Sequence, residues 1–138
     1  MSERVFIDTN LLVYADDADA GVKHQRAREL LGQAIRTGSA VFSTQVLQEY
    51  FAIATRKLGM PAAQARQRVE TLSELPLVVV RPALILAAID LTRLRSISFW
   101  DALIVRAAQS VACARLLTED LQHGSIIEGL LVENPFVS

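Results

Sequence analysis

Four acidic residues have the chemistry from which a metal-dependent hydrolase is built: Asp8, Glu49, Asp101 and Asp120. Carboxylates held close together repel one another and raise each other's pKa, so a fold tolerates such a group when a divalent cation neutralises it. Mg²⁺ prefers oxygen ligands and usually keeps several waters. Carboxylates around one or two such ions suit phosphodiester hydrolysis, because the ion activates a water as the nucleophile and stabilises the leaving oxygen.

Each acid taken alone also has a structural interpretation. Asp8 suits the N-cap of a helix, and Asp101 completes a capping-box pattern with Ser98 before an apolar run. Glu49 flanks an apolar helical stripe, where a glutamate is usually solvated, and Asp120 follows a strand, where an aspartate often forms a turn. The individual signals are weak, so the prediction of a site depends on the placement of all four together.

Short apolar strands that alternate with helices are expected to position these acids. The strand-like runs are 5–7, 41–42, 77–80, 114–118 and 130–132. Helical patterns cover 10–15, 22–37, 44–58, 61–74, 82–94 and 99–113. Prolines at the start of two of these helices and glycines at the ends of two others support the boundaries. The alternation predicts an α/β fold, with a short, mostly parallel central sheet flanked by helices on both faces.

The expected topology brings the four acids to one place. Ligand sites in such sheets lie beyond the carboxyl ends of the strands. Asp8 directly follows the first strand, and Asp120 follows the strand that ends at Thr118. Glu49 lies in the second turn of the helix after the second strand, and Asp101 lies in the first turn of the 99–113 helix. We therefore expect the four carboxylates to converge at one edge of the sheet.

Length and composition favour one ordered domain over residues 1–138, of which 51% are hydrophobic. No stretch approaches the roughly 20 apolar residues of a membrane span, and the N-terminus lacks a signal-peptide pattern, so we expect a cytoplasmic protein. The net charge of −1, from 14 basic and 15 acidic residues, is not the strongly basic balance of a typical nucleic-acid binder. Any binding of a nucleic acid would depend on local basic patches or on bound metal.

Other chemically distinctive residues are interpreted as structural. Cys113 lies in an apolar run with neither histidine near it in sequence, so a buried thiol is expected. His24 and His123 are expected to be structural or solvent-exposed. Trp100 is expected to anchor the core or an interface rather than to stack on a base. Near pairs of basic residues are expected mostly on solvated helix faces, with a few beside the site; they are Arg26 and Arg28, Arg56 and Lys57, Arg66 and Arg68, and Arg93 and Arg95.

Four segments of the chain resemble the motifs of PIN-domain ribonucleases of the VapC toxin type. They are residues 8–14 (DTNLLVY), 43–49 (STQVLQE), 98–104 (SFWDALI) and 116–124 (LLTEDLQHG). The first matches a strand followed by an acid and two polar residues, the second and third each carry one further acid, and the fourth carries the adjacent Glu119 and Asp120. The resemblance extends over the whole chain with the motifs in order, and it implies a three-layer PIN-like fold.

The resemblance implies that the acidic quartet both binds the metal, Mg²⁺ or Mn²⁺, and catalyses RNA hydrolysis; its members are Asp8, Glu49, Asp101 and Asp120. Thr118 would support the pocket through its hydroxyl, and Asn10 would orient Asp8 or a metal-bound water. Thr9 either caps the following helix or touches substrate. The fourth acid is open, because the adjacent Glu119 offers a second carboxylate. The resemblance further implies an RNA substrate, a small antitoxin that enters or covers the acidic groove, and a homodimer.

Other phosphohydrolase motifs fail on specific residues. A haloacid-dehalogenase-like phosphatase needs a second acid and a threonine where this chain has Asn10 and Leu12. A receiver domain needs a late lysine, and no lysine follows Lys57. A non-catalytic binding or dimerisation module and a DNA nuclease stay as alternatives. The presence of all four acids favours a working site over the first, and the short chain without insertions favours RNA over the second.

Overall fold

Strand β1 (Val5–Ile7) lies inside a six-stranded sheet of the computed structural model, which describes residues 3–137. The other strands are β2 (Ala40–Ser43), β3 (Leu77–Val78), β4 (Arg115–Leu117), β5 (Ile126–Ile127) and β6 (Leu130–Glu133). The strand order is β3-β2-β1-β4-β6-β5, and every neighbouring pair is parallel except β5 and β6. The expected mostly parallel α/β sheet is therefore confirmed.

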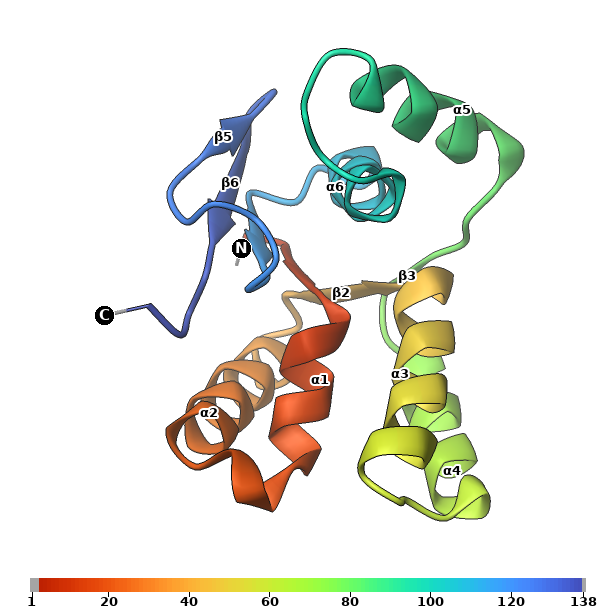
Figure 1. Ribbon diagram of the computed structural model, residues 1–138, viewed down its shortest axis with the longest axis vertical. Helices are drawn as coiled ribbons and strands as arrows, with labels where there is room; N and C mark the ends of the chain where they lie inside the picture. Colours follow the sequence, from red (N-terminus) through yellow and green to blue (C-terminus); the bar gives the residue numbers. More distant parts are fainter. Residues whose placement is uncertain (1–2, 138) are drawn as a thin grey trace.

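Helices lie on both faces of this sheet, as expected (Figure 1). They are α1 (Thr9–Asp16), α2 (Val22–Arg36), α3 (Thr44–Lys57), α4 (Ala62–Ser73), α5 (Pro82–Thr92) and α6 (Phe99–Ser110), with a short 3₁₀ turn η1 (Ala18–Ala20). α1 packs on α2 and α3 packs on α4, so the two pairs form two arms that extend from the same end of the sheet (Figure 1). α5 and α6 pack together on the opposite side of the sheet from these arms.

Polar side chains cap the N-termini of the helices that carry the candidate site residues. Asp8 caps α1, Ser43 accepts a hydrogen bond from the backbone N–H of Val46 in α3, and Ser98 accepts one from Asp101 in α6. Each of these caps satisfies a backbone donor that the first helical turn leaves free. Two of the three helices start directly after a strand, so their first turns lie at the carboxyl edge of the sheet.

The hairpin of β5 and β6 was missed by the sequence prediction, which had only the last strand. Its two-residue turn consists of Glu128 and Gly129, both with positive φ, at 46° and 89°. This is the backbone shape of the tight turns that match the twist of paired strands. The only signal in the sequence was the pair Glu128-Gly129 between two apolar pairs. A segment this short is easily interpreted as a loop.

The end of the last long helix was also placed too far along the chain. α6 ends at Ser110 rather than at residue 113, because Ala112 has a left-handed φ of 56° that a helix cannot continue through. Cys113 then lies buried in the core, as expected, and burial raises the pKa of its thiol to about 11.

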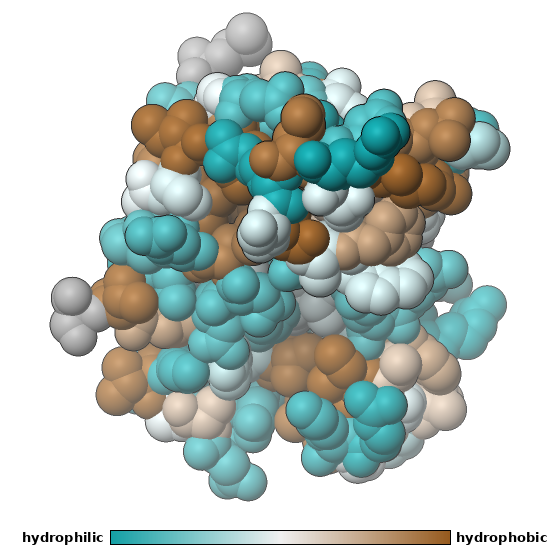
Figure 2. Space-filling view, turned by 45° about the horizontal axis from the view of Figure 1, so that its top comes forward, coloured by the Kyte–Doolittle hydropathy of each residue, from teal (hydrophilic) through white to brown (hydrophobic). Residues whose placement is uncertain are grey.

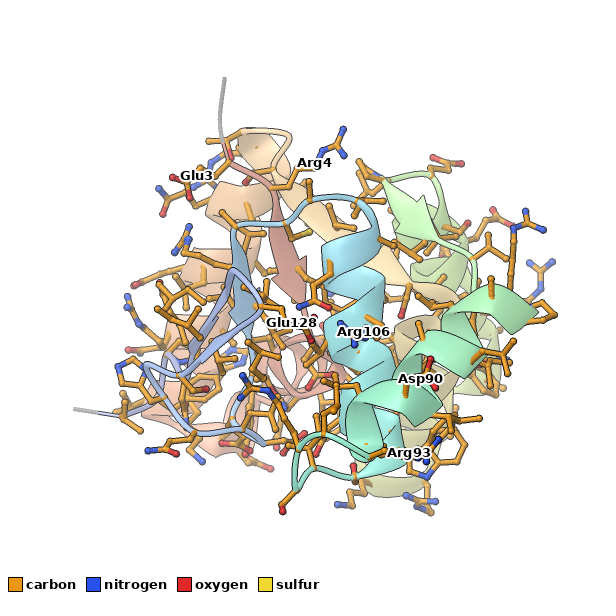
Figure 3. All side chains as sticks on the ribbon, turned by 90° about the horizontal axis from the view of Figure 1, so that it is seen from above. Glu3, Arg4, Asp90, Arg93, Arg106 and Glu128 are labelled. Atoms are coloured by element: carbon orange, nitrogen blue, oxygen red, sulfur yellow. The ribbon has the colours of Figure 1, made fainter. Side chains whose placement is uncertain are left out.

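Arg106 connects α6 to its two neighbours. Its Nε donates to the carbonyl of Ala87 in α5 at 3.2 Å, and its guanidinium lies 3.0 Å from the carboxylate of Glu128 in the β5–β6 turn (Figure 3). Apolar side chains of α5 nevertheless reach the surface, where Leu86 is 62% exposed and Ile89 is 42% exposed. Hydrophobic residues, drawn in brown, interrupt the hydrophilic surface in Figure 2. Across residues 3–137, the helices all fall short of the length and apolar character that crossing a membrane requires.

Candidate active site

Asp8 lies where β1 passes into α1, and it is buried although it carries a carboxylate. Its Oδ1 accepts a hydrogen bond of 2.7 Å from the backbone N–H of Thr9, and its Oδ2 accepts one of 2.7 Å from the Thr118 hydroxyl. Burial raises the pKa of Asp8 to about 6, against the lowering effect of these two donors. Asp8 thus caps the helix with one oxygen and still stands beside the other acids.

Thr118 and Asn10 join Asp8 to the fourth acid. The Thr118 hydroxyl is fully buried, and it accepts hydrogen bonds from the backbone N–H of Asp120 at 3.1 Å and from Asn10 Nδ2 at 3.4 Å. Asn10 Nδ2 also donates to Asp120 Oδ2 at 3.2 Å. This network holds the chain after β4 against the first turn of α1, and it positions Asp120 in the lining of the same cavity as Asp8.

Glu49 is held by Thr9. The Thr9 hydroxyl donates to Glu49 Oε1 at 2.9 Å and so connects α1 to α3. Thr9 does not cap α1, because Asp8 is the N-cap residue. The Thr9 side chain instead positions Glu49. Burial raises the pKa of the half-buried Glu49, and the charges of Asp120 and Asp101 raise it further.

Asp101 enters from the first turn of α6, where its backbone N–H donates to the Ser98 hydroxyl at 3.0 Å. Burial raises its pKa, and the charge of Asp120 adds to this rise. The negative charge of Asp120 in fact raises the pKa of each of the other three acids. The four carboxylates are therefore close enough to repel one another, which is the situation predicted from the sequence.

All four acids line one open cavity of about 440 Å³ between the two arms. Four residues of α3 at a spacing of four contribute one wall: Gln45, Glu49, Ile53 and Lys57. This ridge extends roughly 18 Å along the helix, because each residue advances the axis by about 1.5 Å. The cavity thus runs from the acidic quartet, past apolar side chains of α1 and α3, to an exposed lysine at the end of α3.

Glu119 also lines the cavity, but other groups engage its carboxylate. The Tyr14 hydroxyl donates to Glu119 Oε1 at 2.5 Å, and Lys23 Nζ donates to Glu119 Oε2 at 3.0 Å. Lys23 in turn lies 5.0 Å from the centre of the Tyr14 ring. Glu119 is thus bonded to Tyr14 of α1 and Lys23 of α2, whereas Asp120 is bonded to Asn10 in the first turn of α1, close to Asp8.

Several residues of the cavity were not assigned to the site from the sequence, among them Gln45, Lys57 and Trp100. The spacing of four that links Gln45 and Lys57 to Glu49 was a usable signal for the first two. The core role considered for Trp100 is wrong, because its side chain is 62% exposed and lines the cavity beside Asp101. His24 and His123 make backbone hydrogen bonds at their Nδ1 atoms, with Tyr14 and Asn134.

The donor set of the cavity fits a hard divalent cation. Its polar lining consists mainly of carboxylate and amide groups, and both Asn10 Oδ1 and Gln45 Oε1 are buried acceptors without a hydrogen-bond partner among residues 3–137. Within the same range, no three acidic, histidine or cysteine side chains stand close enough to surround one ion directly. Mg²⁺ commonly takes one or two carboxylates and fills its remaining positions with water, so the wider spacing agrees with that mode of binding.

Comparison with known proteins identifies the family. Residues 5–126 match the profile of the PIN domain. The chain belongs to the PIN domain family. The match includes all four acids of the cavity, and it confirms the family resemblance seen in the sequence motifs.

Solved structures share this PIN fold at low sequence identity. The VapC20 toxin of Mycobacterium tuberculosis, described as cleaving the sarcin–ricin loop, is 22% identical, with a TM-score of 0.67 over 81% of this chain and 86% of that one. A toxin–antitoxin complex from Klebsiella pneumoniae is 19% identical, with a TM-score of 0.67 over 96% of this chain and 98% of that one. VapBC2 from Rickettsia felis, bound to a DNA fragment from its promoter, is 21% identical, with a TM-score of 0.65 over 94% and 97%. Comparison with curated protein sequences gives no match.

Proposed function

We propose that this PIN-domain protein is a metal-dependent endoribonuclease that hydrolyses RNA phosphodiester bonds as the toxin of a toxin–antitoxin pair. The observation that carries the proposal is the single cavity where four mutually repelling carboxylates meet. A buried Asp8 with a pKa of about 6 is costly to keep ionised unless a cation offsets the repulsion. We further propose that residues 1–138 act as one domain in the cytoplasm.

The acidic quartet would hold Mg²⁺ or Mn²⁺, which supplies an activated water and charge stabilisation for the leaving oxygen. The surrounding side chains prepare the acids for that role. The Thr118 hydroxyl stabilises the ionised form of Asp8, and the Thr9 hydroxyl does the same for Glu49. Asn10 holds Asp120 through Nδ2 and keeps a free acceptor oxygen, so it is suited to orient a water beside the acids.

Two observations favour an RNA substrate: a lysine in the lining of the cavity, and the activity given for one structural relative. Lys57 places a positive charge at the far end of the groove that begins at the acids, where it would contact a phosphate of a bound strand. The overall charge of −1 makes such local contacts necessary. The Mycobacterium tuberculosis toxin of the same fold, described as cleaving the sarcin–ricin loop, adds support for RNA.

An antitoxin partner is favoured by the open groove and by the toxin–antitoxin complexes among the structural relatives. An antitoxin segment that enters between the arms would cover the acids and block the substrate. We also propose a homodimer, for which the exposed apolar side chains of α5 offer a surface. Light scattering coupled to size-exclusion chromatography tests the dimer, since a monomeric mass across micromolar concentrations contradicts it.

Cleavage of RNA by purified protein tests the nuclease proposal. Labelled structured RNA, together with total RNA, is incubated with Mg²⁺, with Mn²⁺ and with EDTA. We expect cleavage with either metal, none with EDTA, and none with Asp8→Asn or Asp101→Asn. Asp19→Asn is the matched control, because Asp19 is exposed in η1, outside the cavity and away from α5.

Three outcomes would contradict the proposal in different ways. Full metal-dependent activity of Asp8→Asn would refute the role of the quartet. Cleavage of single-stranded or duplex DNA in preference to RNA would identify a DNA nuclease. Absence of cleavage under every condition, together with absence of metal binding in calorimetry, would identify a non-catalytic module. Strong expression in bacteria without a partner should arrest growth, and Asp8→Asn should relieve the arrest.

A further inference from the structure

Trp100 is a large aromatic side chain that the fold leaves open to the cavity. Its side chain is 62% exposed, and it lines the same cavity as Asp101, its neighbour in α6. Tryptophan usually buries most of its large surface, so an exposed indole beside a polar cavity indicates a binding surface. The chain has a single tryptophan, so this residue can also be followed spectroscopically.

The surrounding residues hold the indole in place without covering it. The ring of Phe99, which packs against the core, meets the indole edge-on at 5.0 Å between centroids and an angle of 72°. The buried Gln45 donates from Nε2 to the backbone carbonyl of Trp100 at 3.3 Å. Gln45 lies one turn before Glu49 on α3, so this bond connects the aromatic residue to the helix of an acid.

We propose that Trp100 stacks on the base of a nucleotide next to the phosphate that is cut. This inference rests on the proposed nuclease function and names a contact within that site. Trp100 and Asp101 line the same cavity, so a base attached to a phosphate held at the quartet lies in that cavity within reach of the exposed indole. Stacking on an aromatic ring accepts every base, because each has a π-face.

Intrinsic fluorescence tests the stacking directly. The probes are a ten-nucleotide RNA spanning the cut mapped in total RNA, and the same backbone with its bases removed. The protein is Asp8→Asn with Mg²⁺, so that the probe stays intact, and saturation is followed by anisotropy of a label on the probe. We expect quenching of the Trp100 emission by the complete RNA and little by the abasic one. Equal effects of the two probes, or no change at saturation, would overturn the proposal.

Substitution of the ring tests its contribution to binding. Trp100→Ala should raise KM for the ten-nucleotide RNA by about five- to one-hundred-fold, in line with the loss of one stacked base. Trp100→Phe should restore most of the affinity, since it keeps an aromatic face. Phe51→Ala is the matched control, because Phe51 is 38% exposed on α3 outside the cavity.

The outcomes separate this inference from the proposed function. If wild-type protein cuts RNA but Trp100→Ala leaves KM unchanged, stacking is wrong and the nuclease assignment stands. If Trp100→Ala weakens only the antitoxin complex, measured by calorimetry, the indole belongs to a protein interface and the proposal fails. If wild-type protein cuts no RNA, the proposed function itself fails and the inference falls with it.

Discussion

Thr118 donates a hydrogen bond of 2.7 Å to the Asp8 carboxylate across the ends of two neighbouring strands. β1 and β4 pair in parallel, with Ile7 beside Leu117, so the next residue of each strand meets the other at the carboxyl edge of the sheet. The backbone N–H of Asp8 also donates to the carbonyl of Leu117 at 3.1 Å. The pairing of the sheet itself therefore aligns the hydroxyl with the acid.

Removing this hydroxyl should weaken the site more than the fold. Thr118→Val keeps the shape of the side chain but removes the donor to Asp8 and the acceptor for the backbone N–H of Asp120. Loss of a group that positions a metal ligand typically lowers metal affinity or activity by about 10- to 100-fold, so we expect a fall of that size in kcat/KM. Thr118→Ser, which retains the hydroxyl, should recover most of it. Equal activity of Thr118→Val and wild type would show that the bond has no role in catalysis.

The ionisation of Asp8 should appear in the pH dependence of stability without metal. Its pKa rises from 3.8 to about 6 on folding, so the unfolded chain releases this proton first. The contribution of Asp8 to stability is then greatest below about pH 4, and it is lost as the pH rises through about 6. In EDTA at pH 7 the melting temperature of Asp8→Asn should therefore exceed that of wild type, by roughly 3 °C or more.

The same comparison has an internal check. Below about pH 4 the advantage of Asp8→Asn should vanish, because the wild-type carboxyl is then protonated in both states. Mg²⁺ should stabilise wild type increasingly from about pH 5 to pH 7, as Asp8 becomes ionised. A melting temperature of Asp8→Asn that lies below that of wild type at every pH would show that the helix cap outweighs the charge repulsion.

The two adjacent acids after β4 should differ in importance. Asp120→Asn removes one of the four carboxylates proposed to hold the metal in the cavity, so we expect a loss of at least about tenfold in kcat/KM. Glu119→Gln should change activity by less than about threefold, because the Glu119 side chain is engaged by Tyr14 and Lys23. The assay is cleavage at saturating Mg²⁺. A larger loss in Glu119→Gln than in Asp120→Asn would reverse the assignment.

The sequence was sufficient to predict where the acids meet, because that place follows from backbone topology. A residue that follows a parallel strand directly, as Asp8 does, or within a few residues, as Asp120 does, lies at the carboxyl edge of the sheet. The caps at Ser43 and Ser98 likewise depend on local bonding that residue types reveal.

Features that depend on tertiary packing were not predictable in the same way. The partners of Glu119 come from α1 and α2, about a hundred residues away in sequence, so only the folded arrangement shows which way its carboxylate turns. The exposure of Trp100 depends on how α6 meets α3, and the sequence alone favoured an anchor for a residue of that size. The β5–β6 hairpin was missed because two strand residues are too few for a periodic signal.

The buried hydroxyl of Tyr50 should stabilise the packing of one arm against the other. Tyr50 of α3 is fully buried, and its hydroxyl donates to Asp16 Oδ2 of α1 at 2.5 Å. Arg68 of α4 lies 3.0 Å from the other oxygen of Asp16, so this network connects three helices. Burial and the nearby Asp16 charge raise the pKa of Tyr50 to about 12, which keeps the hydroxyl a donor at neutral pH.

Tyr50→Phe removes this bond and leaves the ring in place, so we expect the free energy of unfolding to fall by about 1 to 3 kcal/mol. Urea denaturation measures the change. Tyr14→Phe is the comparison for stability, because it also loses a hydroxyl bonded to a carboxylate, but at a partly exposed position where the loss should be smaller. Activity per folded molecule of Tyr50→Phe should stay near wild type, since Tyr50 lines no part of the cavity. Equal destabilisation by the two substitutions would show that burial of the network adds nothing to the stability of the arms.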